Sequence, residues 1–354
     1  MRESLLLFSI VFSFCSFANT EYSQRVWNLQ HTFENASSRH TIVYIDRVDL
    51  AQRIQNLNIE NFEDPKASEK RRNQAVSDYI FDRIHVNLDD LSADLVGDYF
   101  ESGINVAVPV KIKETNKRIC IVFGAQPEST AQEESERMLY WKQMQSTPEY
   151  QGKSIQVQFS KKEFTLLADL HETFHCLDPY YIVKQDEGDY ENQPTVHRAE
   201  SYAEVGALLY LANQGYKDLA LKRALYRTVG SFMVGRHSDL LGPNLYEGIH
   251  FGVVYSFYPA LFAVQKEVDS GVLPSEISEI QRLAHQIVEE YSLSDELEYA
   301  IYQYQRDPET LDDLIRKMKN DKNDYFRTRF EKVEKERDAY IETLNWAFEK
   351  LIKK

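Results

Sequence analysis

A histidine pair with an adjacent glutamate is the part of the sequence best suited to do chemistry. His171 and His175 stand four residues apart, and Glu172 directly follows the first. On a helix, residues four apart project from one face, so both imidazoles can reach a single zinc ion. Glu172 is rotated by one step, so its carboxylate could accept a proton from a water molecule beside the metal. The pattern predicts a zinc site with its own general base, provided that the segment is helical.

A zinc site of this kind needs a third protein ligand, and the sequence offers several candidates. In the metzincin pattern, the third ligand lies six residues after the second histidine and follows a glycine. Here Tyr181 stands at the ligand position and Asp178 stands at the glycine position, so this pattern fails. Glu200 and Glu204 lie four residues apart on one face of a second predicted helix. His197, one turn before Glu200, is either close to the site or a residue of the helix surface.

The residues around the motif predict two helices. Ser160 followed three residues later by Glu163 is a capping box, which marks a helix start. This helix should run through both histidines and stop at Asp178–Pro179, because the residue before a proline disfavours helical geometry. The second helix should begin near Pro194 and end at Gly215.

Alternating apolar residues predict strands ahead of the motif. One strand begins at Thr41, and Ile104–Phe123 has the pattern of a half-buried β-hairpin. Pro109 has no backbone N–H, so its strand should have a free edge. A further short strand is predicted over Ile155–Phe159, directly before the helix that carries the histidines.

This order of elements predicts an α+β fold. A small mixed sheet with an edge strand and an active-site helix would be followed by a mostly helical C-terminal half. We expect residues 19–178 to form an N-terminal α+β subdomain. Residues 179–354 should form a helical subdomain that completes the zinc site. The last helix, from about Tyr325, carries an apolar stripe that is typical of a core position.

The first eighteen residues have the pattern of a cleaved secretory signal peptide. An apolar run from Leu5 to Phe14 precedes Ser16 and Ala18, whose small side chains fit the positions that a signal peptidase reads. The run is short for a membrane span. We therefore expect a secreted or periplasmic protein with no stable membrane insertion after cleavage. Lipid attachment at Cys15 is disfavoured because the residue before it is bulky.

Composition limits the remaining possibilities. The chain has 354 residues, of which 43% are hydrophobic and 27% charged, as in a globular protein with a core. The net charge of -15 argues against nucleic-acid partners and anionic membranes, which need basic surfaces. Cys120 and Cys176 remain after the expected cleavage. They would either form a disulfide or stay as buried thiols, and their spacing does not decide between the two.

With these residues in place, the sequence resembles the gluzincin metallopeptidases, the thermolysin-like group in its broadest sense. Their pattern is H-E-x-x-H followed by E-x-x-x-D on a second helix, and the resemblance covers Ile155–Leu211. It implies a zincin-like fold and one zinc ion bound by His171, His175 and Glu200. It also implies that Glu172 is the general base.

Glu204 stands where this family usually has an aspartate, and would orient one of the ligand histidines. The resemblance further implies a group that stabilises the oxyanion. We expect His237 in this role, with Tyr246 and His250 as alternatives.

The function implied is that of a secreted zinc peptidase acting on a peptide or protein substrate. The strand before the motif would pair with extended substrate. The alternative is a zinc-braced scaffold that binds peptide or envelope partners without turnover.

Overall fold

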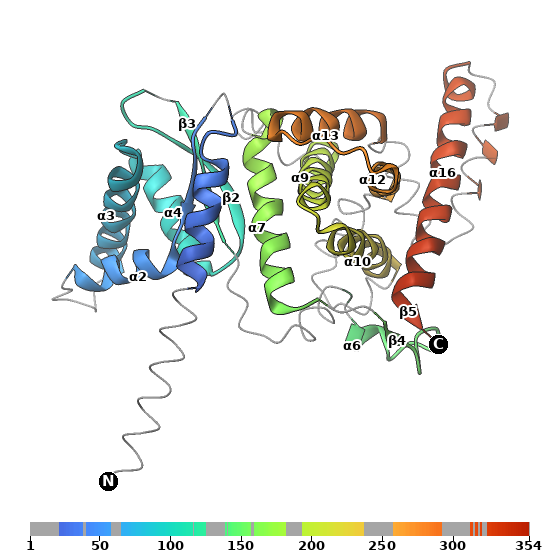
Figure 1. Cartoon of the computed structure of the whole chain (residues 1–354), viewed down its shortest axis with the longest axis horizontal. Helices are drawn as coiled ribbons and strands as arrows, with labels where there is room; N and C mark the ends of the chain where they lie inside the picture. Colours follow the sequence, from blue (N-terminus) through green and yellow to red (C-terminus); the bar gives the residue numbers. More distant parts are fainter. Residues whose placement is uncertain are drawn as a thin grey trace, which may run out of the picture. The chain divides into compact units, whose positions relative to one another are not determined.

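Helices dominate the structure, and a small mixed sheet accompanies them (Figure 1). This confirms the predicted α+β class. The chain divides into one unit of residues 1–126 and 168–182 and a second unit of residues 127–167 and 183–354. The computed structural model describes residues 21–37, 40–57, 65–115, 117–124, 139, 141–156, 159–181, 193–236, 258–291, 312–313, 316–317, 319–320 and 324–353.

The first unit contains a three-stranded sheet ordered β1-β3-β2, in which β1 is parallel and β2 antiparallel to β3. The predicted hairpin is confirmed, and Pro109 lies on an edge strand as expected. Residues 21–33 form a helix. The other elements are β1 (Ile42–Ile45), α2 (Arg47–Asn56), α3 (Pro65–Ile84), α4 (Asp90–Ser102), β2 (Val106–Lys111) and β3 (Arg118–Phe123).

Apolar side chains cover both faces of this sheet, so the prediction of a half-buried hairpin is wrong. All of β1 is buried, and burial in β2 is continuous from Ala107 to Val110. The residues that alternate with the valines of β2 include Ala107 and Pro109, which are themselves apolar. A nearly continuous apolar run is typical of a strand covered on both sides. One face packs against α2, α3 and α4, through Val43, Ile45, Leu50, Val76, Tyr79, Val96, Val108 and Ile121.

Side chains form hydrogen bonds with backbone groups along both outer edges of the sheet. On β1, the amide of Gln30 accepts from the Tyr44 N–H and donates to the Ile42 carbonyl, each at 2.9 Å. On β2, Pro109 offers no N–H, and the Ala107 carbonyl accepts a hydrogen bond from the Tyr181 hydroxyl. Neither edge therefore presents a complete row of free groups to another strand.

The second unit is mainly helical. α9 packs against α10, α12 and α13. The predicted second helix is confirmed, and Gly215 follows it with a φ of 87°, as a helix C-terminal cap requires. The predicted last helix is confirmed too. The elements of the second unit are α6 (Trp141–Met144), β4 (Ser154–Ile155), α9 (Gln193–Asn213), α10 (Lys217–Arg236), α12 (Tyr258–Ser270), α13 (Ile277–Tyr291), α16 (Asp324–Leu351) and β5 (Ile352–Lys353).

The strand predicted over Ile155–Phe159 is not part of the three-stranded sheet. β4 ends at Ile155 and pairs antiparallel with β5, near the end of the chain. Phe159 packs against helix α10, where its ring centroid lies 4.6 Å from that of Tyr226. The apolar alternation here therefore arises partly from contacts with helices, and the predicted edge strand beside the active-site helix is wrong for this segment.

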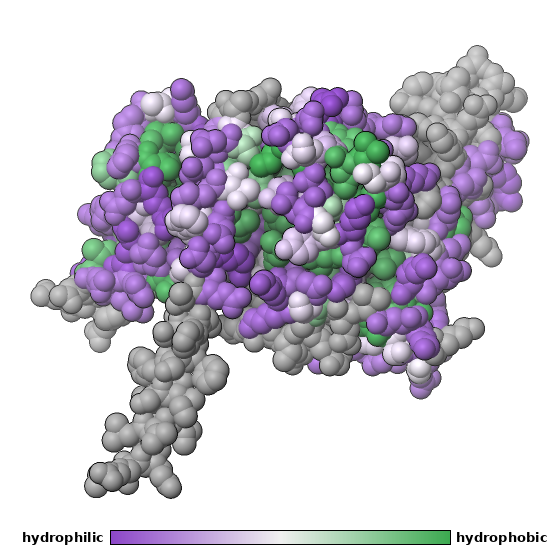
Figure 2. Space-filling view, in the orientation of Figure 1, coloured by the Kyte–Doolittle hydropathy of each residue, from purple (hydrophilic) through white to green (hydrophobic). Residues whose placement is uncertain are grey.

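A largely hydrophilic surface is expected for a chain in which 27% of the residues are charged. Figure 2 shows hydrophilic residues over most of the coloured surface in this view, with smaller apolar patches between them. Single exposed apolar residues such as Leu91 and Val272 are ordinary for a folded protein.

Within the described ranges, no helix has the length and apolar composition required to cross a membrane. The predicted signal peptide lies outside those ranges.

Candidate metal centre

The helix that carries the histidines, α7 (Lys161–Leu177), begins and ends where the sequence predicted. The Ser160 N–H donates to the Glu163 carboxylate at 2.6 Å, and the Glu163 N–H donates to the Ser160 hydroxyl at 3.2 Å. This is the reciprocal pair of a capping box. Lys222 adds an ion pair to Glu163 at 2.9 Å. The start of α7 is thereby fixed by its own first turn and by α10.

Farther along α7, one face is attached to the first unit's sheet and N-terminal helix. Asp169 and Thr173 lie on this face because each helical residue adds about 100°. Asp169 is fully buried and forms an ion pair with Arg25 at 2.7 Å. The Thr173 hydroxyl hydrogen-bonds with the Tyr44 hydroxyl at 2.6 Å. These contacts fix the rotation of the helix about its axis.

A disulfide on the same face answers the question that the sequence left open. Cys176 of α7 is joined to Cys120 of β3, with their Cα atoms 5.6 Å apart. The Nε2 of His40 also donates to the carbonyl of Cys176. The last turn of α7 is thus attached to the sheet through a covalent bond and a hydrogen bond.

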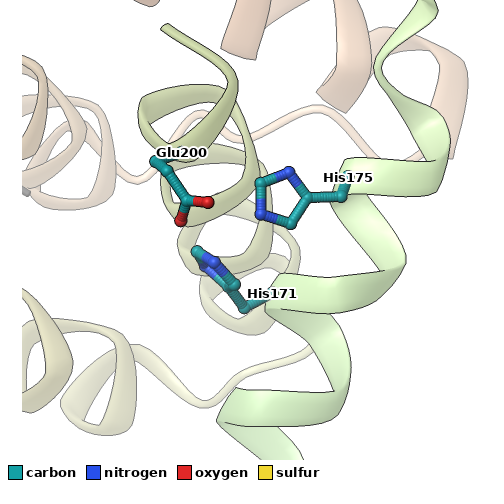
Figure 3. A group of neighbouring side chains, drawn as sticks. All are labelled: His171, His175 and Glu200. Atoms are coloured by element: carbon teal, nitrogen blue, oxygen red, sulfur yellow. The ribbon is translucent and has the colours of Figure 1, made fainter. Parts of the chain in front are cut away.

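The two histidines project from the opposite side of α7. His171 and His175 are buried, and their rings are perpendicular with centroids 4.8 Å apart. Figure 3 shows both imidazoles pointing toward the carboxylate of Glu200 on α9. One ligand atom from each of the three residues lies within 4.8 Å of the others. The structure therefore brings together the three predicted ligands.

These residues fit a metal ion by chemistry and by size. Two imidazoles and one carboxylate form a donor set that zinc commonly takes. In a tetrahedral site with bonds of about 2.0–2.1 Å, neighbouring ligand atoms lie about 3.4 Å apart. The observed limit of 4.8 Å exceeds this by an amount that small side-chain rotations can remove.

Glu172 differs from the ligands in its exposure. The ligand residues are buried, whereas Glu172 is half-buried. It follows His171 directly, so it is rotated by about 100° from the ligand face of the helix. A carboxylate in this position is next to the cluster and still reaches solvent, as a proton acceptor for water requires.

Glu204 is held by two arginines of α10. One carboxylate oxygen accepts from Arg223 Nε at 2.7 Å, and the other accepts from Arg227 Nε at 3.0 Å. Glu204 and Arg223 are buried. The predicted role of Glu204, to orient a ligand histidine, stays a prediction. The two arginines, four residues apart on a buried helix, are a signal that sequence reasoning missed.

The other candidate ligands have different positions. Asp178, His197 and Glu204 are not members of the cluster found among the described residues. His197 is buried, and its Nε2 lies 3.4 Å from the Ser201 hydroxyl. Asp178 is buried and accepts a hydrogen bond from the Tyr180 N–H at 2.9 Å. Both have structural contacts within their own segments.

Three expected residues cannot be placed. His237, Tyr246 and His250, the candidates for stabilising an oxyanion, lie outside the described residues.

Comparison of the chain with protein-family models, curated proteins and solved structures found no match.

Proposed function

We propose that the protein is a zinc-dependent metallopeptidase of the gluzincin type. The observation that carries this proposal is the buried cluster of His171, His175 and Glu200, with Glu172 half-exposed beside it. Structural zinc sites are normally closed by four protein ligands, whereas catalytic sites use three and leave one position open. Three ligands and an adjacent carboxylate match the catalytic arrangement.

The charges of the ligands suit hydrolysis. Two neutral imidazoles and one carboxylate leave a divalent zinc ion with a net positive charge. A zinc ion bound here would supply Lewis acidity, which lowers the pKa of water and polarises a carbonyl group. Glu172 would accept a proton from the attacking water and pass it to the leaving amine. His171, His175 and Glu200 would hold the ion in place.

A zincin-like fold is part of the proposal. A mixed sheet precedes the motif helix, and the third ligand comes from a later helix, as the resemblance implies. The substrate strand needs revision, because Ser154–Ile155 pairs with β5. β2 is an edge strand of the sheet, but Pro109 and the Ala107–Tyr181 hydrogen bond leave few backbone groups there for a peptide. We therefore propose that side-chain contacts dominate substrate binding.

Export from the cytoplasm is also proposed. The pattern at Leu5–Ala18 motivates it. The Cys120–Cys176 disulfide supports it, because disulfides persist mainly in oxidising compartments.

The test is the substitution Glu172→Gln. The amide keeps the volume of the side chain but cannot accept a proton, so zinc should stay bound while hydrolysis is lost. Metal analysis and a broad peptide-library assay should be made on the same preparations. Glu163→Gln is a matched control on the same helix, because glutamine also serves in a capping box. It should keep both zinc and activity.

The alternative function is a zinc-braced scaffold that binds a partner without turnover. It is favoured if the wild-type protein binds one zinc ion but cleaves no peptide in any library. A wild-type protein that binds no zinc at all would refute both functions.

A further inference from the structure

Tyr181 packs directly on one of the metal ligands. Its ring centroid lies 4.9 Å from that of His175, and the two ring planes are inclined by 34°. Tyr181 is 5% exposed and His175 is 3% exposed, so the contact is buried. The imidazole of His175 thus contacts two other rings, because His171 meets it at a right angle.

The turn after α7 explains how Tyr181 reaches this position. α7 ends at Leu177, and the Asp178 carboxylate accepts a hydrogen bond from the Tyr180 N–H at 2.9 Å. Pro179 occupies the first position of the helical segment that begins after Asp178, where its fixed φ is favourable. This side-chain cap separates α7 from the next helical segment, in which Tyr181 packs against His175 in the last turn of α7.

The far end of the Tyr181 ring is fixed as well. Its hydroxyl donates to the Ala107 carbonyl at 2.7 Å. Ala107 is on β2 and pairs with Val122 of β3. The ring is therefore held by the turn at one end and by the sheet at the other. Its hydroxyl is directed to the backbone of β2, so Tyr181 supports the cluster from outside it.

We propose that Tyr181 is a positioning residue for the metal ligand His175. The inference rests on the metal-binding part of the proposed function. A free imidazole samples several rotamers, and only a few of them aim a nitrogen at the ion. Packing against Tyr181 restricts these rotamers before the metal arrives. Partners that orient ligand histidines typically contribute about 10–100-fold in metal affinity.

The experiment compares Tyr181→Leu and Tyr181→Phe with the wild type. Zinc affinity is measured by competition with a chromophoric chelator, and the visible spectrum of the cobalt(II)-loaded protein reports ligand geometry. Tyr181→Leu should lower zinc affinity by about 10–100-fold and alter the cobalt spectrum. Tyr181→Phe keeps the ring against His175, so it should restore a spectrum close to that of the wild type. The zinc affinity of Tyr181→Phe should lie between that of Tyr181→Leu and that of the wild type.

Tyr79 provides a matched control. It is a buried tyrosine of the same unit, and its hydroxyl accepts a hydrogen bond from the Asp46 N–H at 2.8 Å. It belongs to the core on the α3 side of the sheet. Tyr79→Leu should lower thermal stability and leave the zinc affinity and cobalt spectrum unchanged. This separates positioning of a ligand from general stabilisation of the fold.

Each outcome decides the matter. If Tyr181→Leu binds zinc as tightly as the wild type with the same cobalt spectrum, the positioning role is wrong, although the proposed function survives. If the wild type binds neither metal, both fall. If Tyr181→Leu does not fold, Tyr181→Met fills the space with a flexible side chain and is judged by the same affinity and spectrum.

Discussion

Opening the Cys120–Cys176 disulfide should lower the stability of the first unit by an amount that follows from the loop it closes. The two cysteines are 56 residues apart in sequence. In the chain-entropy model, a loop of this length removes about 14 cal/mol/K from the unfolded ensemble. At 25 °C this corresponds to about 4 kcal/mol, which is an upper value because compact unfolded states reduce it.

Urea unfolding of the oxidised protein and of the same protein in a reductant measures the change. With a slope of about 2 kcal/mol per molar urea, the midpoint should fall by roughly 2 M. Hydrogen exchange followed by mass spectrometry assigns the effect to a region. Peptides from β3 should lose protection, whereas peptides from α9, in the second unit, serve as the internal control.

The double substitution of Cys120 and Cys176 by alanine repeats the test without reductant. Both sulfurs belong to buried residues, so alanine adds a packing loss to the entropic one. Equal urea midpoints for the oxidised and reduced wild type would refute the reasoning. A loss of protection confined to α9 would refute its assignment to the first unit.

Three other predictions are testable. Burial raises the pKa of the Glu163 carboxyl, but hydrogen bonds from Ser160 and Lys222 outweigh burial, so the pKa is lowered in the folded protein. The ionised carboxylate therefore stabilises the fold at a pH above the ordinary pKa of a glutamate. This contribution is lost as the pH falls through the lowered pKa. Glu163→Gln should therefore flatten the acid side of a plot of Tm against pH, and an unchanged acid side would contradict this. Glu200→Ala should lose more zinc affinity than Glu204→Ala in chelator competition, and the reverse order would move the third ligand by one helical turn. Mass spectrometry of the exported protein should find a mature N-terminus near Asn19, whereas an intact Met1 on exported protein would exclude cleavage.

Local patterns predicted the elements well where the causes are local. The capping box at Ser160 and Glu163 fixed the start of α7, because both partners lie within one turn. The hairpin followed from apolar alternation, and the free edge of its first strand followed from Pro109. The segment from Ile155 to Phe159 failed because three alternating apolar residues do not specify which partner they pack against. Here the partners are β5 and α10, both distant in sequence.

The candidate site was predictable in part for the same physical reason. His171 and His175 follow from helical spacing alone. Glu200 came from a resemblance, because spacing left Glu204 equally possible, and only the tertiary structure shows Glu200 with the histidines. The support from Tyr181 depends on its contacts with His175 and with the Ala107 carbonyl of β2, which a linear pattern does not reveal. The disulfide likewise required β3 and α7 to be placed in space.

The occupied edges of the sheet have a consequence for the behaviour of many copies of the chain. An uncovered strand edge is a template on which another chain can add a strand, and such addition leads to aggregation and fibre growth. Gln30 imitates a neighbouring strand with its side-chain amide on β1, and Pro109 removes a donor on β2. Each is a single residue that interrupts the row of backbone groups with which a strand of a second molecule would pair. A buried and mostly apolar sheet therefore offers few free backbone groups at these edges for association with a strand of another copy.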